Sequence, residues 1–557
     1  MAMQAGVRRL GRRARWSFLG IGLISAIYAG VFFVAKAQLQ NLLPKAVAVA
    51  VGGRDAEMYS VQVGTVRLSP VLSGLTVKDV VVSVDSARAE AAAEPALVRS
   101  ASLGSVRVSG IRLIPLLRGK GIFVSSIDIV GPTVALEFAP GQMKEPSASD
   151  EEGTEASVPE SGASSPTAVL GRVRVRDGSV DITRVTDRGT LLSFLHGLDL
   201  ELTEIRINSV TFANPASALA NSRVSLAFDT ARHTFDDSLY VVTATQVRAD
   251  SRDSLAQIGT VQLTPTLEAD PFFERLPQRA DRINMSAGPV RVEGLDFARY
   301  VNEESVHVRL IGVDSLDLHV YSDINMEWGP KAQPCRYHMG FGDIEFPLRV
   351  DTIQVNDAMI RYSELAKGSE RAGEVTLEEL TGTVVNLTND PNRMTHETPA
   401  VASVTAKLFG ESDMEATLAY PLLSQTLDFS FEASLGPMSL AIANRFATNA
   451  AGVELEQGQL NSLWVGVDVQ DGRADGSVHM LYQDFDFRLV DKNSLKEKPW
   501  HTVAGFVGGL IVRSNNPGQP DETARNGEID YTCGDNDMVF FEFLIHFLAN
   551  GLKRIVI

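Results

Sequence analysis

Alternation of apolar and polar residues is the dominant pattern of this chain. From Tyr59 onward, stretches such as VQVGTVRLS (61–69), SVRVSGIRL (105–113) and VDTIQVNDAMIRY (350–362) place an apolar residue at about every second position. Successive side chains of a β-strand point to opposite faces, so this period predicts strands with one apolar and one polar face. The pattern therefore predicts a mainly β protein.

Residues 171–183, GRVRVRDGSVDIT, illustrate the two faces. The arginines alternate with Val173 and Val175, and the apolar series resumes at Val180. This predicts two short strands, with Asp177-Gly178 as the turn or bulge between them. A second Asp-Gly-Ser, at 475–477, also predicts a turn, because this composition is typical of turns.

The strand pattern recurs on a larger scale. VRVSGI at 106–111 returns as VRVEGL at 290–295, and the apolar positions of 173–180 correspond to those of 353–360, 180 residues later. Such self-similarity is typical of chains that stack repeated units. We expect two repeat units, at 56–250 and 251–440, followed by a C-terminal β region at 441–536.

Helical patterns are few and short. The best candidates are Asp270–Ile283, Leu295–Glu304, Lys498–Gly509 and an amphipathic terminal helix within 537–557. Residues 140–168 are acidic and rich in Ser and Pro, which predicts a disordered loop inside the first unit.

The N-terminal segment predicts a membrane anchor. Residues 1–15 contain five arginines, and residues 16–35, WSFLGIGLISAIYAGVFFVA, contain no charge. Twenty apolar residues span roughly 30 Å as a helix, enough for a bilayer core. The positive-inside rule places residues 1–15 in the cytoplasm and everything after the anchor outside it. A cleaved signal peptide is the alternative, and it exports the same body.

Charge and composition exclude several classes of protein. The 557 residues carry a net charge of −18, and without the five N-terminal arginines 46 basic residues stand against 69 acidic ones, a net −23. A body this acidic is a poor partner for nucleic acid. Two cysteines, Cys335 and Cys533, are too few for a disulfide scaffold. They either pair or remain two isolated thiols.

No pattern in the chain indicates catalysis. Nucleophile-elbow, HExxH, Walker A, GxGxxG and EF-hand motifs are all missing from the sequence, and the nine histidines are scattered without metal-ligand spacing. We therefore expect no catalytic residue, no metal site and no cofactor, and we interpret the chain as a protein that is not an enzyme.

A long sheet with one apolar face must cover that face. In one arrangement, sandwich or barrel domains bury their apolar faces against each other. In the other, a continuous curled sheet forms a β-groove that acyl chains or the protein's own side chains fill.

The order of segments resembles the AsmA-like family of bacterial envelope proteins, the relatives of TamB. The resemblance rests on the basic N-terminus and anchor, then VGTVRLSPVLSGLTVKDVVVSVD (63–85), VRVSGIRLIPLLRGKGIFVSSIDIVGPTVALEF (106–138) and LGRVRVRDGSVDI (170–182). It continues more loosely to LYQDFDFRLVDK (481–492) and the terminal helix. The resemblance implies an elongated, curled β-groove and an inner-membrane anchor with a periplasmic body. It also implies a role in phospholipid transport or outer-membrane homeostasis, without catalysis.

We expect phospholipid or another acyl lipid as the ligand, at apolar residues that share one phase of the strand pattern. These lipid-groove candidates are Val106, Val108, Ile111, Val173, Val175, Val180, Ile353, Val355 and Ile360. The alternative is a structural or assembly scaffold that binds an envelope protein through sheet edges or the terminal helix.

The terminal helix carries more apolar surface than a free chain end should expose. Phe540, Phe543 and Phe547 either contact a membrane or partner, or they cap the last strands of the chain's own sheet. The sequence leaves both interpretations open.

Overall fold

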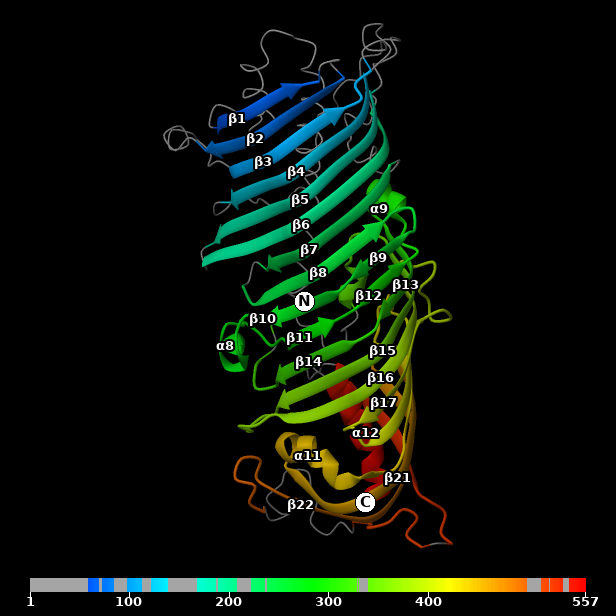
Figure 1. Cartoon of the computed structure of the whole chain (residues 1–557). Coiled ribbons are helices and arrows are strands. Elements are labelled where there is room, and N and C mark those ends of the chain that lie inside the picture. The colour runs from blue at the N-terminus through cyan, green and yellow to red at the C-terminus, as the bar shows by residue number, and fades with distance from the viewer. Residues whose placement is uncertain are drawn as a thin grey trace. The chain divides into compact units, whose positions relative to one another are not determined.

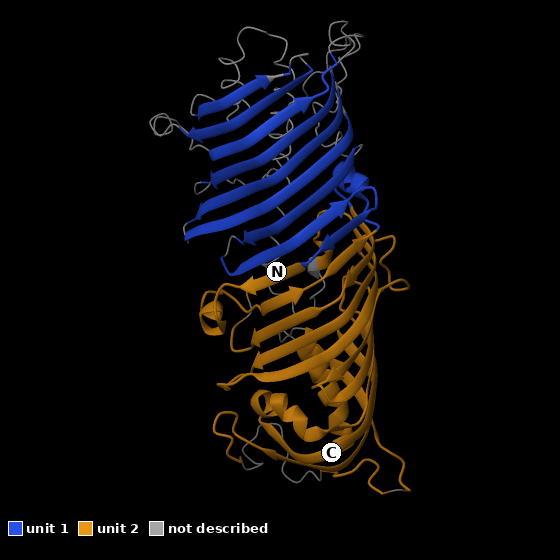
Figure 2. Cartoon of the chain, in the orientation of Figure 1, with its two compact units in different colours: residues 1–259, 294–305 blue, residues 260–293, 306–557 orange. Residues whose placement is uncertain are grey.

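The computed structural model of the chain describes residues 59–69, 73–84, 98–112, 122–138, 168–186, 189–207, 222–235, 238–327, 329, 339–497, 512–519, 521–533 and 540–557. Strands make up most of this part of the chain, which confirms the mainly β fold class (Figure 1). The chain divides into two compact units, residues 1–259 with 294–305 and residues 260–293 with 306–557 (Figure 2).

Each strand of the first unit pairs with the next strand along the chain. Its described residues form β1 (Tyr59–Leu68), β2 (Gly74–Val84), β3 (Val98–Ser109), β4 (Ile122–Phe138), β5 (Ala168–Thr186), β6 (Gly189–Ile207), β7 (Arg223–Thr234), β8 (Tyr240–Asp250) and β9 (Leu255–Ile258), with the short helix α9 (Phe297–Glu303). All these pairs are antiparallel except β4 and β5, which run parallel. A parallel pair needs a long crossover. Residues 139–167 separate these two strands in the sequence and lie outside the described residues, as does nearly all of the predicted loop at 140–168.

A β-bulge interrupts β5 where the sequence allows a turn or a bulge. Val175 faces Leu200 of β6, the register shifts before Gly178, which faces Leu198, and it shifts back before Val180, which faces Leu195. Asp177 has a φ of 53°, and its backbone N–H donates to the Asp199 carboxylate at 3.0 Å. The extra residue returns the apolar series to the face it occupied before the bulge. The bulge interpretation is confirmed, and Ala168–Thr186 is one strand.

The second unit contains the remaining elements of the described chain. In order these are β10 (Thr260–Pro265), α8 (Ala269–Glu274), β11 (Arg282–Ala287), β12 (Val290–Glu293), β13 (Val306–Val313), β14 (Leu316–Asp323), α10 (Met339–Gly342), β15 (Leu348–Leu365), β16 (Gly373–Thr388), β17 (Ala400–Leu408), β18 (Ser412–Tyr420), β19 (Phe429–Leu435), β20 (Met438–Ser439), a 3-10 helix (Leu440–Ala443), α11 (Asn444–Ala451), β21 (Val453–Gln470), β22 (Arg473–Leu489), β23 (Asn526–Thr532) and α12 (Phe540–Val556). β13 and β14 pair in parallel with successive parts of β15. From β15 to β23 the neighbouring strands are antiparallel, and β19 pairs with β21.

The arrangement around β15 repeats that around β5. Each strand has a parallel neighbour on one side and an antiparallel hairpin partner on the other. The register of β15 shifts between Val355 and Ala358 and again before Ile360, which is 180 residues after the shift in β5. Gly110 and Gly294, which close the two copies of the VRV motif, both have a φ of 69°. The repeat read from the sequence is therefore present in the fold, while its boundaries at 250 and 440 stay predictions.

Two local predictions are wrong. The helix expected at Asp270–Ile283 ends after Glu274, because Pro277 lacks the N–H of a helix interior and disfavours helical geometry in the residue before it. The Asp-Gly-Ser at 475–477 lies inside β22, and the hairpin turn before it consists of Asp471 and Gly472, both with positive φ. The expected helix at Leu295–Glu304 is present as α9, and Lys498–Gly509 lies outside the described residues.

The predicted anchor at residues 16–35 and the basic segment at 1–15 lie outside the described residues. Among the helices that the structure describes, none has the length and apolar character needed to cross a bilayer.

Candidate functional site

The apolar face of the first unit continues from strand to strand. The row Leu75, Val108, Ile127, Val173 and Leu202 crosses β2 to β6, each residue directly opposite the next. These side chains are all 4% exposed or less. Cross-strand apolar neighbours of this kind are the unit from which a sheet's buried face is built. These five side chains thus form one continuous apolar surface across β2 to β6 rather than separate patches.

A second row lies beside the first and is less buried. It consists of Val77, Val106, Ile129, Val175 and Leu200, again opposite one another in register. Val106, Val175 and Leu200 are only half-buried. Val77 and Ile129 are buried, at 4% and 6% exposed, so the accessible border of the apolar surface consists of Val106, Val175 and Leu200.

The structure brings together five of the six lipid-groove candidates of the first unit. The cluster contains Val108, Ile111 and Val173 as buried members, with Val106 and Val175 packed against it. The sixth, Val180, lies past the bulge, opposite Val134 of β4 and Leu195 of β6, and is half-buried.

The opposite face of the same strands is polar. Arg174 lies in register between Asp128 and Glu201, and its guanidinium donates to the Glu201 carboxylate at 2.6 and 2.9 Å. The hydroxyls of Ser102 and Thr133 are 2.6 Å apart on this face. Charges and hydroxyls on one face and aliphatic side chains on the other give the unit the two-sided character that the alternation predicts.

The three candidates in the second unit lie on β15 and are half-buried. Val355 and Ile360 pack beside Ala358, on either side of the bulge, in a cluster centred on Ala358, Leu380 and Ala406. Ile353 lies opposite Ile311 of β13 and Val384 of β16.

Helix α12 covers a different part of the second unit's apolar face. Phe543, Phe547 and Ile555 are 0% exposed and pack in a cluster with Val478 of β22 and Ile529 of β23. Figure 1 shows the helix within the curve of the surrounding strands. The helix therefore fills this part of the unit with the chain's own side chains.

The three phenylalanines for which the sequence left a cap and a docking role open lie against the protein's own strands. Phe540 lies 5.4 Å from Phe429 of β19, measured between ring centroids, and Phe543 lies 6.2 Å from the same ring. Phe547 lies 6.4 Å from Phe431. In this position the rings cap the sheet, and their contact with a membrane or a partner stays a prediction.

A buried polar cluster lies at the first turn of α12. The Arg279 guanidinium donates to the Glu542 carboxylate at 2.9 Å and to the Ser322 hydroxyl at 3.4 Å. The Tyr362 hydroxyl donates to the Glu364 carboxylate at 2.8 Å. Arg279, Ser322, Tyr362 and Glu364 are each 7% exposed or less.

Burial changes the protonation of this cluster. Desolvation raises the pKa of Asp281 above its ordinary value of 3.8 and that of Glu364 above 4.5, and the Glu542 carboxylate adds to both shifts. Hydrogen bonds from Ser322 to Asp281 and from Tyr362 to Glu364 act in the opposite direction. Burial, with the neighbouring Glu364 carboxylate, also raises the pKa of Tyr362.

Sequence reasoning missed this cluster, although one signal was present. Glu542 is the single charged residue between Phe540 and Leu552. A lone carboxylate in an apolar helix is expensive to bury without a partner. That cost predicts a buried basic partner, but the partner's position could not be read from the sequence.

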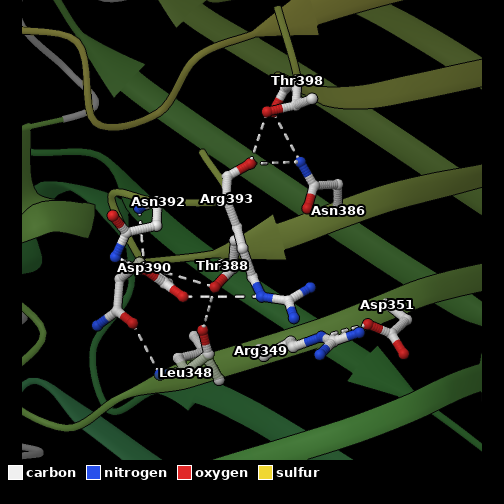
Figure 3. A network of polar contacts seen from close by, with 10 residues as sticks. Leu348, Arg349, Asp351, Asn386, Thr388, Asp390, Asn392, Arg393 and Thr398 are labelled. Atoms are coloured by element: carbon white, nitrogen blue, oxygen red, sulfur yellow. Dashed lines mark hydrogen bonds and ion pairs between the residues drawn. The ribbon is translucent and has the colours of Figure 1, made fainter. Parts of the chain in front are cut away.

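A second polar network fixes the loop between β16 and β17 (Figure 3). The Thr388 hydroxyl donates to the Leu348 carbonyl at 2.8 Å, and the Asn386 side-chain amide donates to the Thr398 carbonyl at 2.7 Å. Arg393 lies 3.7 Å from the Asp390 carboxylate. These contacts satisfy the polar groups of a loop, and their arrangement indicates a structural role.

Among the described residues of the second unit, two pockets have volumes of about 460 and 310 Å³. The larger is lined by His396, Asp428 and Phe429 among others. Burial opposes ionisation of Asp428, but hydroxyls of Ser424 and Thr426 donate to its carboxylate and lower its pKa overall. In a serine–histidine–aspartate relay the hydroxyl donates to the histidine instead, so this cavity lacks that geometry.

Among the described residues, no group of three or more His, Cys, Asp or Glu side chains is placed to hold a metal ion. Cys533 is disulfide-bonded. Cys335, the one other cysteine of the sequence, lies outside the described residues.

No protein-family model matches the chain, and no curated protein matches it.

Proposed function

We propose that this protein is an AsmA-like envelope protein, anchored in the inner membrane, whose β-sheet holds acyl chains of phospholipid against its apolar face. The observation that carries the proposal is the continuous apolar surface from β2 to β6, bordered by the half-buried Val106, Val175 and Leu200. Acyl chains would contact this surface at its half-buried border, because the side chains of the first row are 4% exposed or less.

The energetics of acyl chains explain why such a surface is useful. An acyl chain of ~16 carbons costs roughly 13 kcal/mol to expose to water, at ~0.8 kcal/mol per methylene. Aliphatic side chains on a sheet remove that cost at every position and need no catalytic group. A role in phospholipid transport or outer-membrane homeostasis is consistent with this passive chemistry.

Two features support an envelope location. Residues 1–15 and 16–35 have the charge and apolar pattern of an anchor that exports the body. In addition, disulfides such as that of Cys533 persist in oxidising compartments and are rare in the cytoplasm. The periplasm is oxidising and lies outside the inner membrane, so it agrees with both features.

A scaffold that binds an envelope protein is the alternative function. Phe541 and Ile545 of α12 favour it, because they are 43% and 36% exposed while the opposite side of the helix is buried. Large exposed apolar side chains on one element indicate a contact surface.

Native mass spectrometry of the protein purified from its own membranes distinguishes the two functions. Acyl-chain binding predicts that phospholipid stays bound to the purified protein. A scaffold predicts one dominant protein partner and no bound lipid. Preparations that are consistently free of lipid would overturn the proposed function.

A further inference from the structure

Two kinds of contact attach helix α12 to the second unit. The body of the helix is held by apolar packing, with Phe543 and Phe547 fully buried against β22 and β23. Its first turn is held by the polar cluster, through the ion pair between Glu542 and Arg279. Phe541 completes this second attachment by stacking on Tyr362 of β15, at 5.3 Å between ring centroids.

The polar attachment contains more acidic groups than basic ones. Asp281, Glu364 and Glu542 contribute three carboxyls, and Tyr362 contributes a phenol. Arg279, whose side chain is 5% exposed, is the buried cation among them. Lys492, after β22, also acts on Glu364, while its ammonium donates to the Lys367 carbonyl at 3.3 Å.

Three ionised carboxylates around one buried guanidinium are not a stable arrangement. Like charges at short range oppose ionisation, and burial removes the water that would screen them. Burial and the Glu542 carboxylate oppose ionisation of Asp281 and Glu364, whereas the Arg279 guanidinium favours it, and the net effect raises the pKa of both carboxyls. Protonation of these two carboxyls therefore favours the first turn in its observed position. A buried ion pair does not by itself indicate that it stabilises the fold. Buried ion pairs are also known to act in conformational switches.

We propose that the first turn of α12 is a proton-dependent latch. In the latched position Asp281 and Glu364 are neutral and Glu542 pairs with Arg279. Ionisation of the two carboxyls releases the turn from Arg279 and β15, lifts Phe541 from Tyr362, and opens this edge of the apolar face. The latch is a property of the helix and its contacts, and it holds whether or not the sheet binds acyl chains.

The direction of the pH dependence follows from proton binding. In the released turn the two carboxyls are hydrated and have their ordinary pKa values, 3.8 and 4.5. In the latched turn burial raises both pKa values, so the latched form binds protons more tightly. The latch is therefore strongest below the ordinary values and weakens as the pH rises from them toward the raised values.

Hydrogen exchange measured by mass spectrometry on the full-length protein tests the latch. The amides of residues 544–547 report on the first turn, because in a helix they donate to the carbonyls of residues 540–543. As the pH rises from about 4 to 8, and after correction for the intrinsic exchange rate, their protection should fall by up to about tenfold per pH unit for each proton released. Protection of β5, in the other unit, should not change.

Isosteric amides separate the latch from general unfolding. Asp281→Asn and Glu364→Gln should each reduce the slope of protection against pH, and the double variant should abolish it. Glu528→Gln is the matched control, because it removes the exposed ion pair with Arg554 at the other end of the same helix and should leave the slope unchanged. A flat profile in the unmodified protein would overturn the latch. So would a slope that persists in the double variant.

Discussion

The carbonyl oxygen of Gly551 in α12 occupies the space that a side chain at Gly527 of β23 would need. A Cβ atom at Gly527 would lie 2.0 Å from that oxygen and 2.7 Å from its carbonyl carbon. The reverse approach is also tight, because a Cβ at Gly551 would lie 2.7 Å from side-chain carbons of Val478 and Ile529. At this point helix α12 and strand β23 therefore pack backbone against backbone.

Gly527→Ala should therefore displace α12. The atoms in the way belong to the backbone, so the helix must move, and we expect a loss of about 2–3 kcal/mol in the free energy of unfolding, as for other overpacked cores. Denaturant unfolding measures this loss. Gly312→Ala is the control, because its Cβ would meet nothing nearer than 4.0 Å and its cost should be well under 1 kcal/mol. Equal effects at both sites would show that the close approach does not matter.

The ion pair between Arg279 and Glu542 should show strong coupling. Glu542→Leu leaves a buried guanidinium without its carboxylate and should cost about 3 kcal/mol, and Arg279→Met should cost a similar amount. The double variant should lie within about 1 kcal/mol of the unmodified protein, because neither charge is then left buried. Denaturant unfolding of all four proteins measures the coupling. Additive losses would mean that the pair does not act as a unit.

The disulfide state of Cys533 has a direct chemical test. Protein denatured without reductant should react with no alkylating reagent at this position, and reductant should make the thiol fully reactive. Loss of the bond in Cys533→Ser should cost about 2–4 kcal/mol in the free energy of unfolding. Alkylation of Cys533 before reduction would contradict both the bond and the support that it lends to an oxidising compartment.

Local pattern predicted much of the fold. The alternation around Val173 and Val175 identified both faces of β5, because the side-chain period of a strand is visible in any short stretch of sequence. The Asp177-Gly178 pair indicated an interruption, and the correspondence at 353–360 indicated a repeat, although it did not predict the bulge that the structure shows there in β15. Composition could not decide between a turn and a bulge, since an Asp-Gly pair is compatible with both.

The features that could not be predicted from the sequence depend on long-range contacts. Arg279 and Glu542 are 263 residues apart, so no local pattern joins them. The burial of Phe543 and Phe547 against β22 and β23 depends equally on tertiary packing, and the sequence left a cap and a docking surface equally open. Pro277 ended the expected helix at a position where apolar periodicity alone suggested its continuation.

Lipid retention in a matched pair of variants tests the central claim most directly. Val175→Glu puts a charge on the half-buried border of the apolar face. Thr203→Glu puts the same charge on the polar face, in register between Arg172 and Arg223. We predict that phospholipid bound per protein, measured by native mass spectrometry after purification from membranes, falls by about tenfold or more in Val175→Glu and is unchanged in Thr203→Glu, because a carboxylate next to an acyl chain is poorly solvated. Equal retention in both variants, with both folded, would contradict acyl-chain binding at this face.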